Sequence, residues 1–342
     1  MTATVPDALR DASRGTSREA YITGTGMYVP DKVLTNADLE RIVDTTDEWI
    51  TTRTGIKERH IAANGVGSSD MALPASRDAL AAAGLTPEDV ELIIVSTFTP
   101  DSPCPASSCL LQEKLGAKNA ASFDLNAACS GFIYGLTTAR QFVVSGMYDR
   151  VLVVGVDKLS SVTNWKDRNT CVLFGDGAGA AVVTCEKKGL KLRGGYLGAD
   201  GSMATLLHVP GGGSVAPATH ETVDQDLHYI IMKGREVFKA AVLSMEKAVD
   251  RLLKQEGIDK REIRWLIPHQ ANMRIIKVLS DYLELPMEKV HLNIQDYGNT
   301  SAATTAIGLH LVNAAGQFAR GEKIVLVAFG GGFTWGACLI EC

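Results

Sequence analysis

Four short apolar runs, rich in β-branched residues and without polar alternation, constrain the fold of this chain more than any other feature. A run of this kind is typical of a strand that is buried on both faces, as in a sheet covered by helices on each side. We therefore expect a layered α/β protein. The four runs are Glu91–Ser96, Arg150–Gly155, Arg264–Ile267 and Lys323–Ala328. Helical patterns lie between them, at Ser69–Ala83, Cys129–Ser145, Arg235–Gln255 and Thr300–Phe318.

The order of these segments repeats along the chain. Each half has a buried strand, then a polar turn leading into a helix, then a second buried strand. The spacing agrees: Cys129 follows Thr97 by 32 residues, and Asn299 follows His269 by 30 residues. A duplicated α/β unit explains this order. We expect a first half over residues 20–190 and a second half over residues 191–342, preceded by a flexible, polar leader over residues 1–19.

Composition excludes several classes of function. The chain of 342 residues has a net charge of −5 and no block of like charge, so we expect neither a nucleic acid nor a membrane surface as partner. No run approaches the roughly 18 apolar residues of a membrane span, and the first residues lack the apolar core of a signal peptide. The seven cysteines are odd in number and show no CxxC pair, which argues against a disulfide framework or a metal site. We expect a cytoplasmic protein.

Cys129 is the candidate nucleophile. It follows a predicted strand and begins a predicted helix, among the small residues Ala127, Ala128, Ser130 and Gly131. The free N–H groups and the dipole at a helix N-terminus favour an anion, so we expect a lowered thiol pKa there. The alternative is a small hydrophobic residue of the core, which is the ordinary role of a buried cysteine.

His269 and Asn299 are the candidate partners of this thiol. Taken singly, His269 at a strand end could be a structural hydrogen-bonding residue, and Asn299 could be a helix cap or a turn residue. Taken together with Cys129, they occupy corresponding strand ends of a duplicated fold, where such sheets place their ligand sites. A thiol, an imidazole and a carboxamide can take up an acyl group and then stabilise a carbanion.

Two glycine runs differ in their surroundings. Gly330, Gly331 and Gly332 lie between large aromatic residues after the last buried strand, where close backbone approach could provide an oxyanion hole from a main-chain N–H. A tight turn is the alternative. The run Gly211–Gly213 has no phosphate-loop pattern around it, so we interpret it as an ordinary flexible loop.

The segment 44–60 combines Trp49 and Arg53 with further cations. Tryptophan and arginine together could stack on an adenine and contact phosphates. On spacing alone, a solvated helix and turn is the simpler interpretation.

These motifs in this order resemble the thiolase superfamily, and most closely its β-ketoacyl-acyl carrier protein synthase III family. The resemblance covers the chain from about Tyr21 to Cys342 and implies a thiolase-like, five-layer αβαβα sandwich of two duplicated halves that forms a homodimer. The motifs that carry it are Asp47–Ile50, Arg53–Ile56, Ala128–Phe132, Phe174–Gly179, Pro268–Asn272, Gly298–Ala302 and Phe329–Gly336.

The resemblance implies roles for individual residues. Cys129 would accept the acyl group, His269 and Asn299 would stabilise the enolate formed when a malonyl thioester loses CO2, and the N–H groups of Cys129 and Gly331 would form the oxyanion hole. The remaining implied roles concern substrate binding: Trp49 and Arg168 around the adenine of coenzyme A, Arg53 and Arg274 near its phosphates, Asn272 and Phe238 along the tunnel, and Arg274 and Lys277 in a carrier-protein docking patch.

The implied reaction is a decarboxylating condensation of an acyl-CoA with malonyl-acyl carrier protein, in which acyl-CoA is a substrate and no cofactor is permanently bound. Cys104 would lie at the acyl pocket of the partner subunit, and because it is small we expect primers larger than acetyl. The alternatives are a synthase III-like acyltransferase or starter condensing enzyme of a secondary-metabolite or cofactor pathway, and a catalytically silent binding subunit. The long loop 210–226 has no assigned role.

Overall fold

The computed structural model of the chain describes residues 18–342. The prediction of a flexible leader therefore falls outside the described residues for positions 1–17. The last two leader residues belong instead to the folded part of the chain: Arg18 donates to the Val143 carbonyl at 3.0 Å and forms an ion pair with Asp149. Glu19 accepts a hydrogen bond from the Tyr21 hydroxyl at 2.6 Å and pairs with Lys191.

Nine strands form one continuous sheet in the order β11-β12-β13-β8-β1-β7-β6-β4-β5. The two parts of this sheet are joined only through β1 and β8, which pair at two positions. The first part contains β1 (Tyr21–Tyr28), β4 (Leu92–Ser96), β5 (Ala121–Leu125), β6 (Arg150–Asp157) and β7 (Gly177–Thr184). The second part contains β8 (Leu190–Ala199), β11 (Ile263–Pro268), β12 (Lys323–Gly330) and β13 (Thr334–Glu341).

The strand pairing confirms the predicted duplication. Moving outward from β1, the order is β7, β6, β4 and β5, with two antiparallel pairings followed by two parallel ones. Moving outward from β8, the order is β13, β12 and β11, with two antiparallel pairings followed by a parallel one. A single parallel bridge between Leu266 and Val290 stands where the fifth strand would be. The predicted division after residue 190 stays a prediction.

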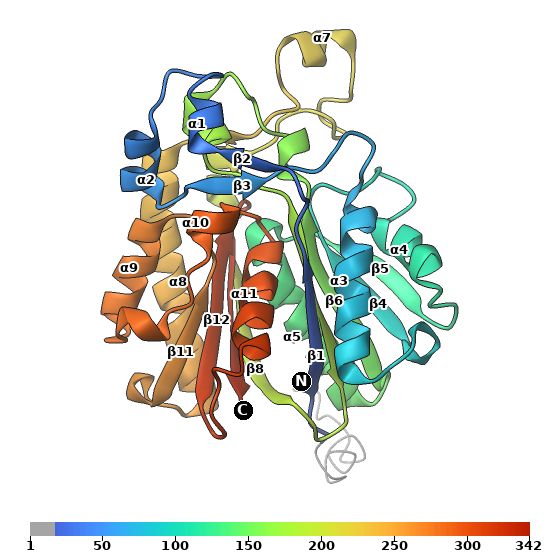
Figure 1. The fold of residues 1–342 in the computed structure, drawn as a ribbon. Helices are drawn as coiled ribbons and strands as arrows, with labels where there is room; N and C mark the ends of the chain where they lie inside the picture. Colours follow the sequence, from blue (N-terminus) through green and yellow to red (C-terminus); the bar gives the residue numbers. More distant parts are fainter. Residues whose placement is uncertain (1–17) are drawn as a thin grey trace, which may run out of the picture.

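Helices cover both faces of each part of the sheet, which gives the five layers seen across Figure 1. The outer helices of the first part are α3 (Ser68–Ala83) and α4 (Ser107–Leu115), those of the second part are α8 (Gly234–Glu256) and α9 (Met273–Tyr282), and the shared central layer holds α5 (Gly131–Ser145) and α11 (Ala303–Ala314). Because helices cover both faces of the sheet, the predicted strands are apolar at every position. In β4, for example, Ile94 packs in the central core and Ile93 in the outer core.

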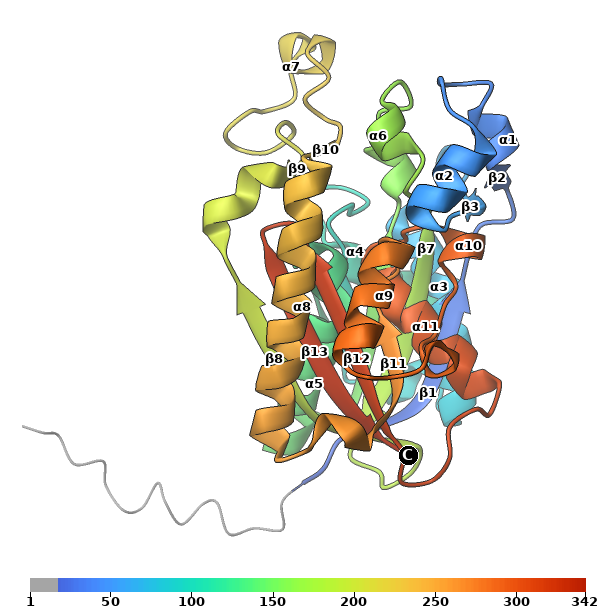
Figure 2. The same cartoon turned by 90° about the vertical axis from the view of Figure 1, so that its left-hand side faces the viewer.

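Short elements cover the end of the sheet at the top of Figures 1 and 2. They are β2 (Val33–Thr35), α1 (Asn36–Leu39), α2 (Asp47–Thr54), β3 (Glu58–His60), α6 (Arg168–Cys171), β9 (Leu207–His208), α7 (His220–Asp224), β10 (Ile231–Met232) and α10 (Ile294–Tyr297). The helix α7 lies within the segment 210–226, which the sequence analysis treated as a loop. Among residues 18–342, no helix combines the length and the apolar character that crossing a bilayer requires.

Two predicted helix starts are wrong by a few residues. Residues Ala128–Ser130 form a separate 3-10 turn, so α5 begins at Gly131 rather than at Cys129. Helix α11 begins at Ala303 rather than at Thr300, because Ser301 has a left-handed backbone with φ of 51°. Both irregular segments lie at the same end of the sheet, and both carry a residue of the predicted site.

Candidate active site

One cavity of about 1630 Å³ brings together the predicted catalytic residues. Its lining includes Cys129 from the 3-10 turn after β5, His269 from the loop after β11, Asn299 from the turn before α11, and Gly331 from the loop after β12. These four residues come from both halves of the chain. The cavity therefore lies where the two repeats of the fold meet, at the carboxyl ends of parallel strands.

A strained turn presents the thiol of Cys129 to this cavity. Ala128 has a φ of 45°, which is uncommon for a residue with a side chain and turns the chain sharply before α5. The Ser130 hydroxyl donates to the Ala127 carbonyl at 2.8 Å, and so does the Thr334 hydroxyl, also at 2.8 Å. The turn is thus held by one hydrogen bond within it, from Ser130, and by a second from Thr334 of β13.

The predicted lowering of the Cys129 thiol pKa is wrong for the ligand-free chain. Burial raises the pKa to about 12, and the charge of Asp157 adds to that rise. The Ser301 hydroxyl, which donates to Cys129 Sγ at 3.3 Å, and the backbone N–H of Cys129 act in the opposite direction but do not outweigh burial. The thiol is therefore protonated at neutral pH.

This state of the thiol predicts an unusual alkylation profile. The rate of Cys129 alkylation by iodoacetamide should keep rising about tenfold per pH unit from pH 7 to 10, because the thiolate fraction rises until the pKa is reached. Free cysteine, with a pKa of about 8.5, should level off within that range. Quantifying the labelled Cys129 peptide by mass spectrometry tests this, and a plateau near pH 8 would contradict the buried, protonated thiol.

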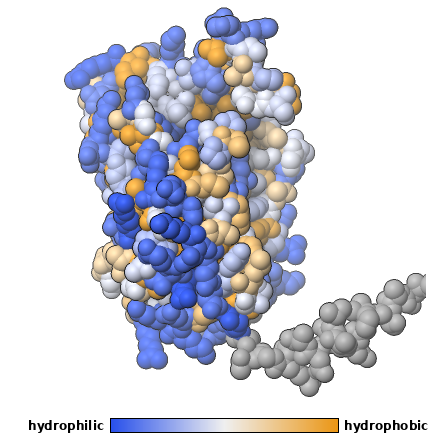
Figure 3. All heavy atoms as spheres, turned by 90° about the vertical axis from the view of Figure 1, so that its right-hand side faces the viewer, coloured by the Kyte–Doolittle hydropathy of each residue, from blue (hydrophilic) through white to orange (hydrophobic). Residues whose placement is uncertain are grey.

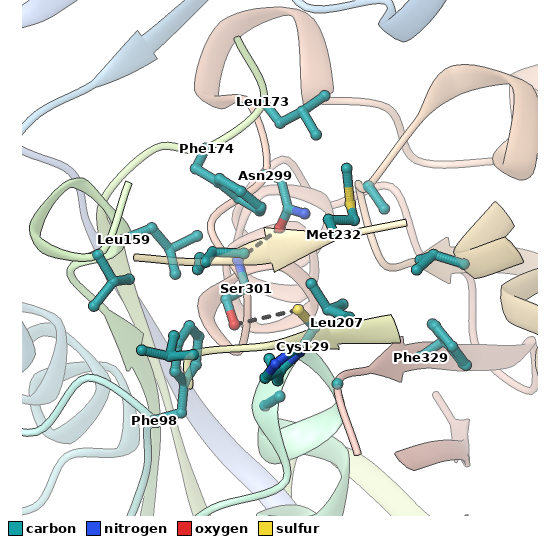
Figure 4. Close-up of a pocket in the computed structure, with 18 of the residues that line it drawn as sticks. Phe98, Cys129, Leu159, Leu173, Phe174, Leu207, Met232, Asn299, Ser301 and Phe329 are labelled. Carbon is teal, nitrogen blue, oxygen red and sulfur yellow. Dashed lines mark hydrogen bonds between the residues drawn. The ribbon is translucent and has the colours of Figure 1, made fainter. Parts of the chain in front are cut away.

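The carboxamide of Asn299 is held by its oxygen, and within residues 18–342 its NH2 group donates to no other residue. Its Oδ1 accepts the backbone N–H of Ser301 at 2.9 Å, as Figure 4 shows together with the Ser301 contact to Cys129. The backbone of Asn299 is bonded on both sides to the first half of the chain, to the Leu173 carbonyl at 2.9 Å and to the Gly175 N–H at 3.0 Å. Asn299 is therefore not a helix cap: its side-chain oxygen holds a turn, as one of the alternatives expected, and the predicted donor role would fall to its NH2 group.

His269 is buried, and its imidazole is neutral. Burial lowers its pKa to about 3, so the ring carries a single N–H at any pH near neutrality. Its backbone N–H donates to the Val327 carbonyl at 2.8 Å, which ties the loop to β12. The following Gln270 folds back, and its side-chain carbonyl accepts the N–H groups of Asn293 and Ile294. That contact explains why the sequence places a glutamine directly after the histidine.

The glycine run after β12 lies against the nucleophile turn. A Cβ at Gly330 would come within 2.6 Å of the backbone nitrogen of Cys129, so only glycine fits there. Gly331 borders the cavity, and a Cβ there would come within 3.1 Å of the Leu207 carbonyl. The backbone of the glycine run therefore lies against that of Cys129 at the cavity wall, so the two segments predicted to form an oxyanion hole are neighbours.

The residues predicted to bind coenzyme A gather at one side of the cavity. Trp49, Arg53, Phe238, Asn272 and Arg274 all contribute to its lining. Arg168 does not, but its guanidinium lies 5.0 Å from the centre of the Trp49 ring. The Arg53 guanidinium lies 4.6 Å from the same ring. An adenine between Trp49 and Arg168 would need about twice the 3.5 Å of a stacking contact, so Arg168 must move to admit one.

Besides Arg168, two predicted residues do not line this cavity in their own chain. Cys104 is exposed, in the segment between β4 and α4, and Lys277 is exposed on α9. Asn272 has a structural contact as well, because it caps α9 and donates to the Arg53 carbonyl at 3.1 Å.

Ser301 and an apolar collar around the thiol belong to the site but were not among the residues predicted from the sequence. The collar, labelled in Figure 4, consists of side chains from both halves: Phe98, Leu159, Leu173, Phe174, Leu207, Met232 and Phe329. Ser301 lies within a quoted motif, but its contact with Cys129 depends on a left-handed backbone that the sequence does not reveal. Among residues 18–342, no cluster of three metal-ligating side chains occurs.

Comparison with known proteins agrees with this geometry. The family model for 3-oxoacyl-[acyl-carrier-protein (ACP)] synthase III matches residues 123–201, and the model for its C-terminal part matches residues 253–342. The β-ketoacyl-[acyl-carrier-protein] synthase III of Caldanaerobacter subterraneus subsp. tengcongensis is 54% identical over 322 residues, which cover 94% of this chain and 97% of the relative.

Two solved structures are similar as well. The 3-oxoacyl-[acyl-carrier-protein] synthase III from Aquifex aeolicus VF5 has a TM-score of 0.87 at 49% identity, covering 94% of this chain and 100% of its own. The priming β-ketosynthase from the R1128 polyketide biosynthetic pathway has a TM-score of 0.88 at 35% identity, covering 95% of this chain and 96% of its own.

The fold and the site together define an acyl-transferring condensing enzyme of the thiolase superfamily. Its layers are those of the solved relatives, and a cysteine, a histidine and an asparagine share its cavity. The chain belongs to the β-ketoacyl-[acyl-carrier-protein] synthase III family.

Proposed function

We infer that this chain catalyses the decarboxylating Claisen condensation of an acyl-CoA primer with malonyl-acyl carrier protein. The products are 3-oxoacyl-acyl carrier protein, CO2 and CoA, and the reaction initiates fatty acid synthesis. The observation that carries this inference is the joint presence of Cys129, His269 and Asn299 in one cavity of a chain so similar to its synthase III relatives. Each of the three side chains can perform one part of the reaction.

In the first half-reaction, Cys129 Sγ attacks the carbonyl carbon of the acyl thioester. The N–H groups of Cys129 and Gly331 hold the oxyanion that forms, and the CoA thiolate then leaves with the proton that the Cys129 thiol gives up. The result is an acyl group on Cys129 and free CoA.

In the second half-reaction, the malonyl thioester loses CO2, and its electrons remain as an enolate. The N–H of the neutral His269 imidazole and the free NH2 group of Asn299 donate to the enolate oxygen. The enolate carbon attacks the acyl carbonyl, and Cys129 leaves as a thiolate that takes a proton from solvent. A carboxylate in place of either donor would repel the enolate.

We propose that the nucleotide of acyl-CoA binds at the side of the cavity that carries Trp49. Trp49 and Arg168 would enclose the adenine once Arg168 has moved, Arg53 and Arg274 would meet the phosphates, and Phe238 and Asn272 would line the tunnel. The exposed Arg274 and Lys277 on α9 would contact the acidic carrier protein. The cycle needs no permanently bound cofactor.

The chain is proposed to act as a homodimer in the cytoplasm. Strand β5 is the outermost strand of the first half, so its outer edge is free to pair among the described residues. Figure 3 shows the face that carries this half, where apolar side chains form a band beside a strongly hydrophilic patch. An antiparallel pairing of two β5 strands would cover part of this face.

A second candidate is a starter condensing enzyme of a secondary-metabolite pathway. The similarity to the priming β-ketosynthase of the R1128 pathway supports it, and the same three residues would carry the chemistry. A kinetic comparison separates the two candidates: fatty acid synthesis requires turnover with a fatty-acid carrier protein, whereas a pathway-specific starter enzyme would prefer its own carrier. A silent binding subunit would release no CO2 from malonyl-acyl carrier protein in either case.

The acyl range provides a further prediction. Cys104 of one protomer is proposed to end the acyl pocket of its partner, so the wild type should accept butyryl-, isobutyryl- and hexanoyl-CoA besides acetyl-CoA. Cys104→Phe should narrow this range toward acetyl, because overpacking a pocket costs about 1–3 kcal/mol, roughly tenfold or more in kcat/KM. The measurement is kcat/KM for the four primers on both proteins. An unchanged profile would show that Cys104 does not bound the pocket.

A further inference from the structure

Arg59 is the largest side chain that the fold buries completely, with 0% of it exposed. A buried cation is costly, and it is normally paired with a carboxylate. Within residues 18–342, Arg59 forms no ion pair; its partners are neutral. Nη1 donates to the Leu34 carbonyl at 3.1 Å and to Asn36 Oδ1 at 2.9 Å, and Nη2 donates to the Val172 carbonyl at 2.8 Å. The free-energy cost of burying Arg59 without an ion pair indicates that this residue organises the elements around it.

The first branch of these contacts leads to helix α2. Asn36 Oδ1 accepts a hydrogen bond from Arg59. The NH2 group of Asn36 donates to Asp47 Oδ1 at 2.7 Å and to the Ile56 carbonyl at 2.8 Å. Asp47 is the first residue of α2, which carries Trp49 and Arg53. The position of that helix therefore depends on a chain of hydrogen bonds that starts at Arg59.

The second branch leads to helix α6. Val172, which accepts from Arg59 Nη2, is the residue at which α6 ends, and α6 carries Arg168. The guanidinium of Arg168 lies against the Trp49 ring of α2. The two elements that flank the proposed adenine site are thus joined beneath it by one buried guanidinium.

We propose that Arg59 is a positioning residue that holds α2 and α6 at the separation needed to bind the nucleotide of acyl-CoA. This inference rests on the proposed function, since it concerns the binding of that substrate. Arg59 does not line the cavity and touches none of the reacting atoms. Its planar fork reaches three acceptors at once, on β2, on α1 and at the C-terminus of α6, in a fixed geometry that a flexible ammonium group lacks.

The test compares two acyl donors, one with the nucleotide and one that lacks both the nucleotide and the part of the pantetheine arm next to it. Acetyl-CoA contains both, whereas acetyl-N-acetylcysteamine is a thioester that lacks both. In Arg59→Met, which keeps an unbranched apolar stem and removes the guanidinium donors, acylation of Cys129 by subsaturating acetyl-CoA should slow about tenfold, as expected when several buried hydrogen bonds are lost. Acylation by acetyl-N-acetylcysteamine should stay within about twofold of wild type. Intact-mass spectrometry measures both rates.

A surface variant tests the same link without disturbing the core. Asp47→Ala removes the shorter of two hydrogen bonds from Asn36 to α2, the other being to the Thr51 hydroxyl at 3.3 Å, and should also slow acylation by acetyl-CoA selectively. The matched control is Glu48→Ala, which removes the same charge from the next position of the same turn; its side chain holds no hydrogen bond among the described residues. Removing a negative charge near an anionic ligand should by itself strengthen binding, so a selective loss in Asp47→Ala alone would support the positioning role.

Several outcomes would overturn the proposal. If Arg59→Met slows acylation equally with both thioesters, Arg59 acts only on the fold or on the nucleophile. If the rate of acylation by acetyl-CoA is unchanged, Arg59 does not position the nucleotide site. If Arg59→Met does not fold, equal rates of acylation by acetyl-CoA in Asp47→Ala and Glu48→Ala would be sufficient to reject the positioning role. A wild-type protein that neither thioester acylates would contradict the proposed function itself.

Discussion

Replacing Cys129 by alanine should reduce condensation on the order of 10⁴-fold or more, as expected when a nucleophile is removed from a covalent mechanism. The release of CO2 from malonyl-acyl carrier protein should persist in this variant. The reason is that the enolate donors, His269 and Asn299, lie on other elements and stay in place. Condensation is measured as 3-oxoacyl-acyl carrier protein formed, and decarboxylation as CO2 released.

Cys109→Ala is the matched control for this experiment. Cys109 is exposed on α4 and lies outside the cavity, so its removal should leave both activities within about twofold of wild type. Condensation that survives in Cys129→Ala would exclude Cys129 as the acyl carrier.

Replacing Asn299 or His269 by alanine should have the complementary effect. Decarboxylation of malonyl-acyl carrier protein should fall roughly 10²-fold or more, because each side chain supplies a hydrogen-bond donor to the enolate. Self-acylation of Cys129 should fall much less. Single-turnover acylation by mass spectrometry and CO2 release measure the two half-reactions separately.

Asn299→Asp adds an isosteric test, since a carboxylate of nearly the same volume would repel the enolate and should be at least as inactive as the alanine variant. The control is Asn313→Ala, at the far end of α11, where the amide contacts only Thr25 at 3.4 Å among the described residues. An equal loss in both half-reactions of Asn299→Ala would argue against the assigned division of roles.

The layered fold could be predicted from the sequence because the decisive signal is local. Runs such as Arg150–Gly155 are apolar at every position, and the structure places Val151 in the central core and Leu152 in the outer core. The duplication was visible in the spacing of the two halves and appears in the order of the strands. The helix starts at Cys129 and Thr300 were predicted too early, since Ala128 and Ser301 have left-handed backbones that local propensity does not favour.

The candidate site could be predicted only in part. Cys129, His269 and Asn299 were found because their residue types suit one chemistry and their positions correspond in the two halves. The pKa of the thiol was predicted in the wrong direction, because a helix terminus is visible in a sequence whereas the depth of burial is not. Arg59 illustrates the same limit: a charged residue in a polar segment gives no sign that the fold encloses it completely.

The most direct test of the central claim is to locate the acyl group after a single half-reaction. Wild-type protein is incubated with acetyl-CoA or isobutyryl-CoA without malonyl-acyl carrier protein, and its intact mass and peptides are then measured. We predict one acyl group per chain, on Cys129 and on none of the other six cysteines, and its loss when malonyl-acyl carrier protein is added. An acyl group on Cys104 or Cys109, or turnover with no acylated chain at any time, would contradict the account.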